Sequence, residues 1–193
     1  MARPPSYDRQ EVLEQVKTIF WTQGYAATSI KDLMAATGLQ PGSIYGAFKN
    51  KKNLFRIVLE DHFVELEAQI RALMESDQPI RERMETFLMD AIRQDYEQPD
   101  NRAGSFLLNT LQETTIDPET MERVREMIAT LEKLLENALR KAQMKGELGA
   151  DKEPAVLASY FMTVMFGLRV QYRRGPRRSQ LEAVARTALC ALA

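Results

Sequence analysis

The 193-residue chain contains a single cysteine and a single histidine. One cysteine excludes an intramolecular disulfide, and one histidine excludes a histidine-rich metal site. The sequence also lacks the HExxH, GxSxG, GxGxxG and P-loop patterns that carry metal, nucleophile, dinucleotide and phosphate chemistry. We therefore expect no catalysis, no cofactor and no bound metal.

The chain also lacks a long hydrophobic segment. Its uncharged and mainly apolar stretch at residues 154–168 has 15 residues, fewer than the ~20 that a helix needs to span a bilayer. The first residues, MARPPSYD, have no apolar run of the kind found in a signal peptide. With 45% hydrophobic and 27% charged residues, the composition is typical of a soluble globular protein. We expect a cytoplasmic protein without membrane contacts.

The alternation of apolar and polar residues that marks β-strands is missing, whereas apolar residues recur at helical spacing along most of the chain. This pattern predicts an all-α protein. Asp8 and Glu11 resemble a capping box that opens a first helix, which Gly24 ends. Residues 51–75 predict a long helix that bridges two halves of the molecule. Residues 154–172 are apolar around nearly the whole helix, which predicts burial on two sides and a second subunit.

Two short predicted helices lie on either side of a turn at residues 37–40. Ser29 and Asp32 form a capping box that starts the first helix, and Pro41 suits the first position of the second. Gly38 can adopt the positive φ that a tight turn needs. This spacing is typical of a helix-turn-helix. The side chains predicted to face outward from the second helix are those of Gln40, Ser43, Gly46 and Ala47.

The charge distribution and the outward face both favour DNA as a partner. Residues 1–60 carry 8 Lys and Arg against 5 Asp and Glu, and residues 41–56 hold four basic residues and no acid. Small residues let a helix approach base edges in the major groove, where Gln40 and Ser43 can form hydrogen bonds. The N-terminus of the helix at Lys51 suits a phosphate. Two alternatives to DNA binding remain at this point. The basic charge by itself would favour a solvent-exposed helix end, and the turn by itself would favour a helical hairpin with a purely structural role.

Two nearly gapless segments, QGYAATSIKDL at 23–33 and TGLQPGSIYGAFKNKKNL at 37–54, resemble the N-terminal signature of the TetR family of bacterial transcriptional regulators. The resemblance implies a helix-turn-helix DNA-binding domain at 1–50 and an effector-binding and dimerisation domain at 51–193. It also implies a homodimer that binds a double-stranded DNA operator. Thr28 and Tyr45 would contact the DNA backbone and Lys51 a phosphate. The full set of implied DNA-binding residues is Thr28, Ser29, Gln40, Pro41, Gly42, Ser43, Tyr45, Gly46, Lys49 and Lys51.

The second half contains many methionine and aromatic residues, which are typical both of core packing and of an adaptable apolar pocket. We predict a small apolar or aromatic effector that one or two polar groups orient, with core packing as the alternative for each residue. The candidate pocket residues are Phe87, Phe106, Met127 and Met165 as walls, with Asn109 and Tyr160 as polar groups. The candidate dimer interface consists of Val164, Phe166, Leu181, Val184, Ala188 and Leu189. Cys190 lies among apolar residues and is predicted to be buried and unreactive.

The main hypothesis is a ligand-responsive repressor that binds a palindromic operator and is released by its effector. One alternative is a helical small-molecule-binding protein with a purely structural helix-turn-helix, and another is a transcriptional activator of the same fold. A helical-bundle enzyme would need two carboxylate–histidine metal motifs, which one histidine cannot supply.

Overall fold

The computed structural model describes residues 7–97 and 104–193. Within these ranges the chain is helical and contains no strand, which confirms the all-α prediction. The elements are α1 (Arg9–Ala27), α2 (Ile30–Thr37), α3 (Pro41–Phe48), α4 (Lys51–Glu75), α5 (Ile80–Glu97), α6 (Phe106–Leu111), α7 (Pro118–Met144), α8 (Pro154–Tyr172), α9 (Arg178–Ala188) and the 3-10 helix η1 (Leu189–Leu192). No helix in the described part is long and apolar enough to cross a membrane.

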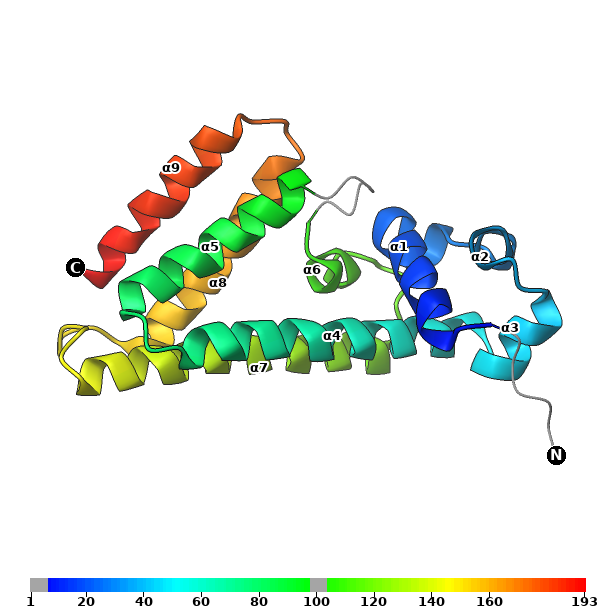
Figure 1. Cartoon of the computed structure of the whole chain (residues 1–193), viewed down its shortest axis with the longest axis horizontal. Coiled ribbons are helices and arrows are strands. Elements are labelled where there is room, and N and C mark those ends of the chain that lie inside the picture. Colours follow the sequence, from blue (N-terminus) through cyan, green and yellow to red (C-terminus); the bar gives the residue numbers. More distant parts are fainter. Residues whose placement is uncertain (1–6, 98–103) are drawn as a thin grey trace.

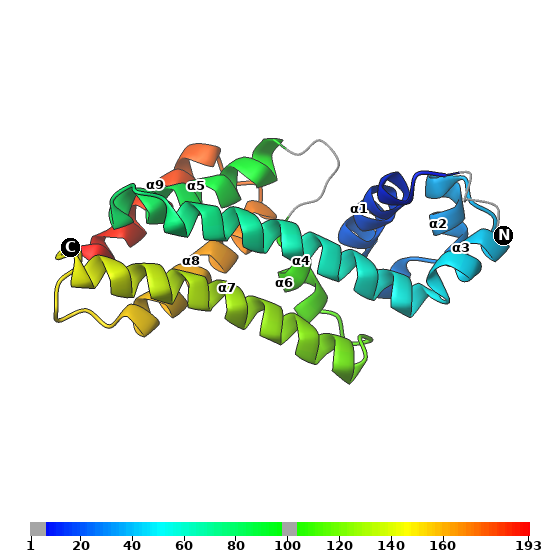
Figure 2. The same ribbon diagram turned by 60° about the horizontal axis from the view of Figure 1, so that its bottom comes forward.

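The helices form two groups that α4 joins. Helices α1, α2 and α3 lie at one end of the elongated molecule, and α5, α8 and α9 lie at the other (Figure 1). Helix α4 contacts α1 and α3 in the first group and α5 in the second. Helix α7 runs beside α4 along much of its length, as both views show (Figures 1 and 2). The long bridging helix predicted for residues 51–75 is therefore confirmed.

The ends of the first helices follow the capping chemistry of the sequence. The Asp8 carboxylate accepts hydrogen bonds from the backbone N–H groups at the start of α1, and Ser29 with Asp32 forms the predicted capping box of α2. Gly38 ends α2 in the left-handed region at φ 68°, and Pro41 occupies the first turn of α3. These local signals fix the turn between α2 and α3.

Helix α1 is interrupted at Gly24, where the backbone has φ 81° and ψ 165°. This region is accessible essentially to glycine alone. The carboxylate of Glu113, which follows α6, accepts hydrogen bonds from the N–H groups of Tyr25 (2.7 Å) and Ala26 (3.0 Å). The interruption therefore frees two backbone donors, and a residue from the second half of the chain binds them.

We expect Gly24→Ala to lower the free energy of unfolding by about 1–3 kcal/mol through backbone strain alone. A Cβ at Gly24 would also lie 2.8 Å from Oε1 of Glu113, so this carboxylate would have to move and release its two donors. Urea denaturation measures the loss. Gly146→Ala is the control for a positive φ, because Gly146 has φ 77° at the end of α7 and open space around its Cβ among the described residues. Equal losses in the two variants would contradict a role for Glu113.

The structure corrects the prediction for Cys190, which is exposed. Leu189 and Leu192 turn inward and are buried, so η1 places the thiol between them on the outer side. The apolar residues next to Cys190 in sequence are buried themselves, but they do not cover its thiol.

Candidate nucleic-acid interface and ligand cavity

Helix α3 is attached by one face and exposed on the other. Ile44 and Phe48 are buried, each at 1% exposure, and Leu33 of α2 is fully buried beside them. Leu39, in the turn between α2 and α3, is half-buried. The exposed side chains at this end of the molecule, together with the half-buried Pro41, include most of the predicted DNA-contacting residues: Gln40, Pro41, Gly42, Ser43, Tyr45, Gly46 and Lys49.

Nothing among the described residues requires glycine at Gly42 or Gly46. A Cβ built at either position would meet no atom of the described part of the chain within 4 Å. Glycine inside a helix costs about 0.5–1 kcal/mol relative to alanine. Two such residues on the exposed face of an eight-residue helix therefore suit an approach by something outside the chain, as when a helix backbone enters a major groove.

Two predicted DNA-contacting residues, Thr28 and Ser29, form side-chain hydrogen bonds with nearby residues of their own chain. The side chain of Thr28 is 1% exposed, and its Oγ1 donates to the carbonyl of Gly24 at 2.7 Å. The Thr28 side chain is thus directed into its own chain, and the contact with the DNA backbone that the resemblance implied for this residue stays a prediction. Ser29 is exposed, but its hydroxyl donates to Asp32 at 2.6 Å within the capping box. This hydrogen bond lowers the pKa of the Asp32 carboxyl.

Lys51 points toward the chain instead of away from it. Its Nζ donates to the carbonyls of Tyr25 (2.9 Å) and Thr28 (2.8 Å) and lies 4.3 Å from the centre of the Tyr25 ring. Two of the three ammonium donors thus join the start of α4 to the end of α1. The phosphate contact predicted for Lys51 stays a prediction, and its structural role was missed.

The next two basic residues form ion pairs within the chain, which qualifies the expectation that this whole stretch serves a polyanion. Lys52 pairs with Asp117 (3.1 Å), and Arg56 pairs with Asp117 (2.7 Å) and Glu119 (2.6 Å). Although desolvation favours the protonated carboxyl, hydrogen bonds from Thr120, Lys52 and Arg56 hold the pKa of Asp117 well below its usual range. These cations fasten α4 to the start of α7.

Lys49 is exposed and its backbone is strained. It has φ 66° and ψ −57°, and the N–H of Asn50 donates to the carbonyl of Phe48 at 2.8 Å. This geometry is the rare γ-turn with a positive central φ. The turn ends α3 abruptly and places Asn50 to cap α4, where its side chain accepts from the N–H of Asn53.

We expect Lys49→Gly to raise the free energy of unfolding by about 1 kcal/mol, because relief of strain exceeds the entropy cost of glycine. The same change should weaken binding to any DNA and lower the salt slope by about one ion. Lys49→Ala is the control, since it removes the charge and keeps the strain. Thermal unfolding and salt titrations of DNA binding separate the two effects. If the Lys49→Gly protein were no more stable than the Lys49→Ala protein, the result would contradict backbone strain at Lys49.

Comparison with known proteins identifies the family. The model described as bacterial regulatory proteins, tetR family, matches residues 12–58. A second model, described as the tetracyclin repressor-like C-terminal domain, matches residues 81–188. The chain belongs to the TetR family. It is accordingly a DNA-binding transcriptional regulator, as the resemblance of residues 23–54 implied.

Curated relatives and solved structures of the TetR family match over nearly the whole chain. The HTH-type transcriptional repressor ComR of Escherichia coli (strain K12) is 29% identical over 190 residues, which is 97% of this chain and 90% of ComR. The repressor AcnR of Corynebacterium glutamicum is 26% identical over 180 residues, 93% of this chain and 89% of AcnR. A cysteine mutant of the TetR-family regulator CifR, solved with a 26-base-pair operator, superimposes with a TM-score of 0.90 at 27% identity and covers both chains completely.

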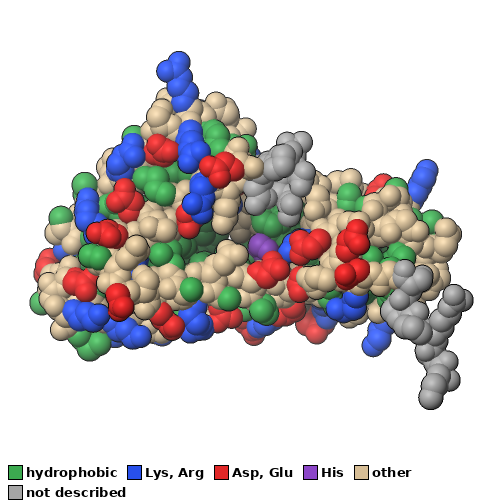
Figure 3. Space-filling view, viewed as in Figure 1, with side chains coloured by type: hydrophobic (Ala, Val, Ile, Leu, Met, Phe, Trp, Pro, Cys, Tyr) green, Lys and Arg blue, Asp and Glu red, His purple; other side chains and the backbone are tan. Residues whose placement is uncertain are grey.

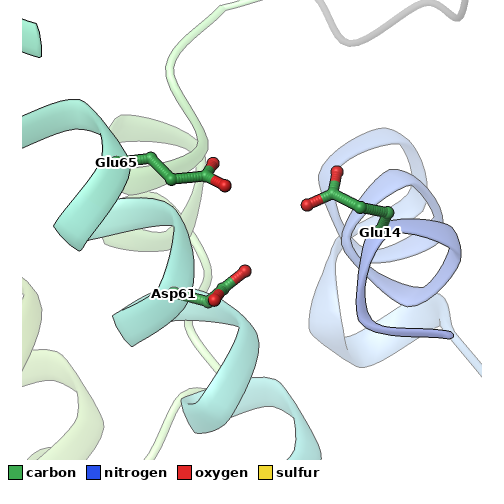
Figure 4. A group of neighbouring side chains, drawn as sticks. All are labelled: Glu14, Asp61 and Glu65. Atoms are coloured by element: carbon green, nitrogen blue, oxygen red, sulfur yellow. The ribbon is translucent and has the colours of Figure 1, made fainter. Parts of the chain in front are cut away.

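Three carboxylates gather where α1 meets α4 in this TetR-family chain. Glu14 of α1 faces Asp61 and Glu65 of α4 (Figure 4), with oxygens within 4.8 Å of one another. Lys17, buried at 4% exposure, pairs with Glu14 (2.5 Å) and Glu65 (3.1 Å). Burial opposes the charge of Lys17, but these hydrogen bonds raise its pKa overall. The cluster is therefore a bridge between two helices of the regulator.

The C-terminal half of the TetR-family chain contains a cavity of about 90 Å³, partly open to solvent, between α4, α5, α7 and α8. Figure 3 shows the face hollowed in this region, with hydrophobic side chains inside. Two predicted pocket residues, Phe87 and Met165, lie in the wall. Phe166, predicted for the dimer interface, also lies there. The polar wall residues, which sequence analysis missed, are Gln69, Asp90, Gln94, Ser105 and Arg169.

The other four predicted pocket residues lie elsewhere. Phe106 stacks on Trp21 with ring centres 5.5 Å apart and packs edge-on against Phe55. Met127 is fully buried at a separate surface hollow between α4 and α7. Asn109 accepts a hydrogen bond from Arg173, and Tyr160 is 38% exposed on the outside of α8. Apolar helical spacing marks a buried face, but it does not indicate which neighbouring space that face lines.

Proposed function

We propose that the protein is a homodimeric repressor that inserts α3 of each subunit into successive major grooves of a two-fold-symmetric operator. The exposed face of α3 carries the proposal, because its glycines leave Gln40 and Ser43 unobstructed on a helix that Ile44 and Phe48 anchor. The names of ComR and AcnR support repression over activation. The protein would act in the cytoplasm, where bacterial DNA lies.

We assign DNA binding to residues 1–50 and effector binding with dimerisation to residues 51–193. Helix α4 supports this division, because it begins beside α3 and ends beside α5 and therefore joins the two domains. The same helix contacts both groups of helices, so the two domains share it. The two recognition helices must lie about 34–36 Å apart to occupy successive grooves. An effector that favours another spacing would weaken operator binding, and a typical coupling of about 1–3 kcal/mol corresponds to about 5- to 150-fold.

The central experiment selects bound sequences from a random duplex pool with the full-length protein. Enrichment of an inverted repeat, followed by repression of a reporter that carries it, supports the proposal. Enrichment of no sequence at low salt would favour the alternative of a small-molecule-binding protein with a structural helix-turn-helix. Increased reporter expression would identify an activator.

We expect Gln40→Ala and Ser43→Ala each to reduce discrimination among operator variants by about 1–3 kcal/mol, since each would remove a direct contact with a base. Competition binding with single-base operator variants measures the change. Lys49→Ala is the control, because loss of a charge should weaken binding to all sequences alike. A uniform loss for Gln40→Ala or Ser43→Ala would contradict base recognition by that residue.

The proposed dimer surface is the outer face of α8 and α9. On α8, Val156 (60% exposed), Tyr160 (38%) and Val170 (47%) lie on one side of the helix together with Gly167. A Cβ at Gly167 would meet no atom of residues 7–97 and 104–193 within 4 Å, so these parts of its own chain do not require glycine there. We propose that a second copy packs closely at this point, and that Val184 of α9, 53% exposed, extends the surface.

Most of the residues first predicted for this interface are buried or half-buried within their own chain. Leu181, Ala188 and Leu189 are buried within their own chain at 4%, 3% and 1% exposure, because α9 packs this stripe on α5 and α8. Val164 is half-buried against the same core. Val184 alone of the six predicted residues is strongly exposed. An amphipathic stripe looks the same in sequence whether it covers its own core or a partner.

A further inference from the structure

The break in α1 at Gly24 leaves a short helical turn, residues 25–27, between the body of α1 and α2. The first two N–H groups of this turn, those of Tyr25 and Ala26, donate to the carboxylate of Glu113 at 2.7 and 3.0 Å. Hydrogen bonds from a backbone N–H to an ionised carboxylate are shorter and stronger than those between neutral groups. Glu113 therefore holds the segment through which α1 leads into the helix-turn-helix.

A positive charge holds the other end of this turn. Lys51, the first residue of α4, donates from Nζ to the carbonyls of Tyr25 and Thr28 at 2.9 and 2.8 Å. A negative group at the start of a helical turn and a positive group at its end both complement the peptide dipoles. Glu113 and Lys51 thus bind the backbone of the turn from opposite ends, one from the C-terminal half and the other from α4.

Glu113 is itself fixed to the C-terminal half of the chain. Its N–H donates to the carbonyl of Thr110 at 3.1 Å, and Thr110 is 1% exposed. Helix α6, which contains Thr110, lies between the two groups of helices (Figure 1) and contacts both α1 and α7. Phe106 and Leu107 of the same helix are buried. The position of the Glu113 carboxylate therefore follows that of the C-terminal helices.

The start of α6 carries a second link to α1. Nε1 of Trp21 donates to the carbonyl of Gly104 at 3.2 Å. Gly104 is bonded in turn to the C-terminal helices, because its N–H donates to Asp95 of α5 at 3.0 Å and its carbonyl accepts from Arg169 of α8 at 3.3 Å. A single line of contact along α4 would permit the DNA-binding helices to rotate about that axis. Links at both ends of α6 provide a second support that opposes this rotation.

We propose that Glu113 is a positioning residue that sets the half-site spacing which the dimer accepts on DNA. It acts through residues 25–28, whose orientation it fixes relative to the C-terminal half, and not through a contact with DNA. The inference rests on the proposed function, because only a dimer on a two-fold operator has a spacing to select. Without the Glu113 bonds, each recognition helix could reach half-sites at other spacings.

The test uses the full-length protein and three duplexes: the selected inverted repeat, and the same repeat with one base pair inserted or removed at its centre. One base pair shifts a half-site by about 3.4 Å and turns it by about 35° around the DNA axis. A rigid dimer cannot follow this change and loses the second half-site, so wild-type affinity should fall by about 10²-fold or more on both altered duplexes. Fluorescence-anisotropy titration measures the three affinities.

Glu113→Gln is the informative variant, because it keeps the size of the side chain but loses its charge and one of the two acceptor oxygens. Its preference for the selected spacing should fall to about tenfold or less. Gly24→Ala should act in the same direction by another route, since its Cβ would lie 2.8 Å from Oε1 of Glu113 and displace that carboxylate. Both proteins should keep the wild-type preference for bases within a half-site, because the exposed face of α3 is unchanged.

Glu147→Ala is the matched control for lost stability. The Glu147 carboxylate accepts from the N–H of Ile80 at 2.8 Å and pairs with Arg83 at 3.9 Å, wholly within the C-terminal half. Its loss should lower the free energy of unfolding, but the spacing preference should stay at the wild-type value. An equal fall in spacing preference in Glu147→Ala would show that general destabilisation relaxes the spacing, and it would overturn the proposal.

The spacing measurements separate this role of Glu113 from the proposed function. If the random pool yields an inverted repeat but the wild type accepts all three spacings equally, the role of Glu113 is refuted and the repressor is not. The same holds if Glu113→Gln keeps the wild-type spacing preference. If the pool yields no inverted repeat, the proposed function itself is refuted, and Glu113 has no spacing to set.

Discussion

Replacing Asp95 with alanine should destabilise the fold by about 3–5 kcal/mol, the range measured when one member of a buried ion pair is removed. Arg169 would keep its charge at 9% side-chain exposure, with Gln94 and the Gly104 carbonyl as its remaining acceptors. The Gly104 N–H would also lose its acceptor. Chemical denaturation monitored by circular dichroism gives the difference, and a loss of this size removes a large part of typical domain stability.

The double variant Arg169→Met/Asp95→Asn is the matched comparison. It removes both charges but retains an amide oxygen for Gly104, so it should lose much less stability than Asp95→Ala. Asp90→Ala, which breaks an ion pair whose side chains are 37% and 53% exposed, should change stability by at most about 1 kcal/mol. If Asp95→Ala behaved like Asp90→Ala, the buried pair would not be a structural element.

Tyr160→Asp should convert the dimer to monomers and reduce operator affinity by about 10²–10⁴-fold, because each monomer holds one half-site without the benefit of the second. The substitution places a charge on the same face of α8 as Gly167, about two turns away, where we propose that the two copies of α8 approach most closely. Tyr160 is 38% exposed in the single chain, so the fold itself should tolerate the change. Sedimentation equilibrium and operator titration measure the two effects.

Met144→Asp is the control for this variant. Met144 is 76% exposed at the end of α7 and lies on neither α8 nor α9. It removes an exposed apolar side chain without touching the proposed surface, and both association and operator binding should stay unchanged. Tyr160→Asp protein that sediments as a dimer at micromolar concentration would place the subunit interface elsewhere.

Features that depend on neighbouring residues were predictable from the sequence. The capping box of Ser29 and Asp32, the left-handed Gly38 and the start of α3 at Pro41 all rest on interactions within a few residues. The bounds of α4 and α8 were predicted for the same reason. The exposed face of α3 follows from these elements, since helical periodicity directs Ile44 and Phe48 inward.

Features that depend on distant partners were not predictable. Lys52 and Arg56 belong to a basic stretch in sequence, but Asp117 and Glu119 neutralise them from more than sixty positions away. Arg169 is followed in sequence by further arginines at the end of α8, and only the packing of α5 against α8 brings Asp95 to it. The resemblance implied a phosphate contact for Lys51, and nothing local in the sequence shows that the Tyr25 and Thr28 carbonyls converge on it. Sequence periodicity indicates which side of a helix is buried, whereas the identity of the partner is a property of the folded chain.

Because α4 is one continuous helix, a small tilt of its axis displaces its far end by a larger distance than its near end. Its 25 residues form one rod about 37 Å long, at about 1.5 Å per residue, with α3 at one end and the cavity wall of Leu66, Ile70 and Leu73 toward the other. A tilt of about 3° displaces one end of such a rod by about 2 Å relative to the other. Two rods tilting oppositely in a dimer would change a 34–36 Å groove spacing by about 4 Å. By tilting α4, a ligand of a few atoms could therefore change the spacing of the two recognition helices and weaken DNA binding. No part of the DNA-binding domain would need to unfold.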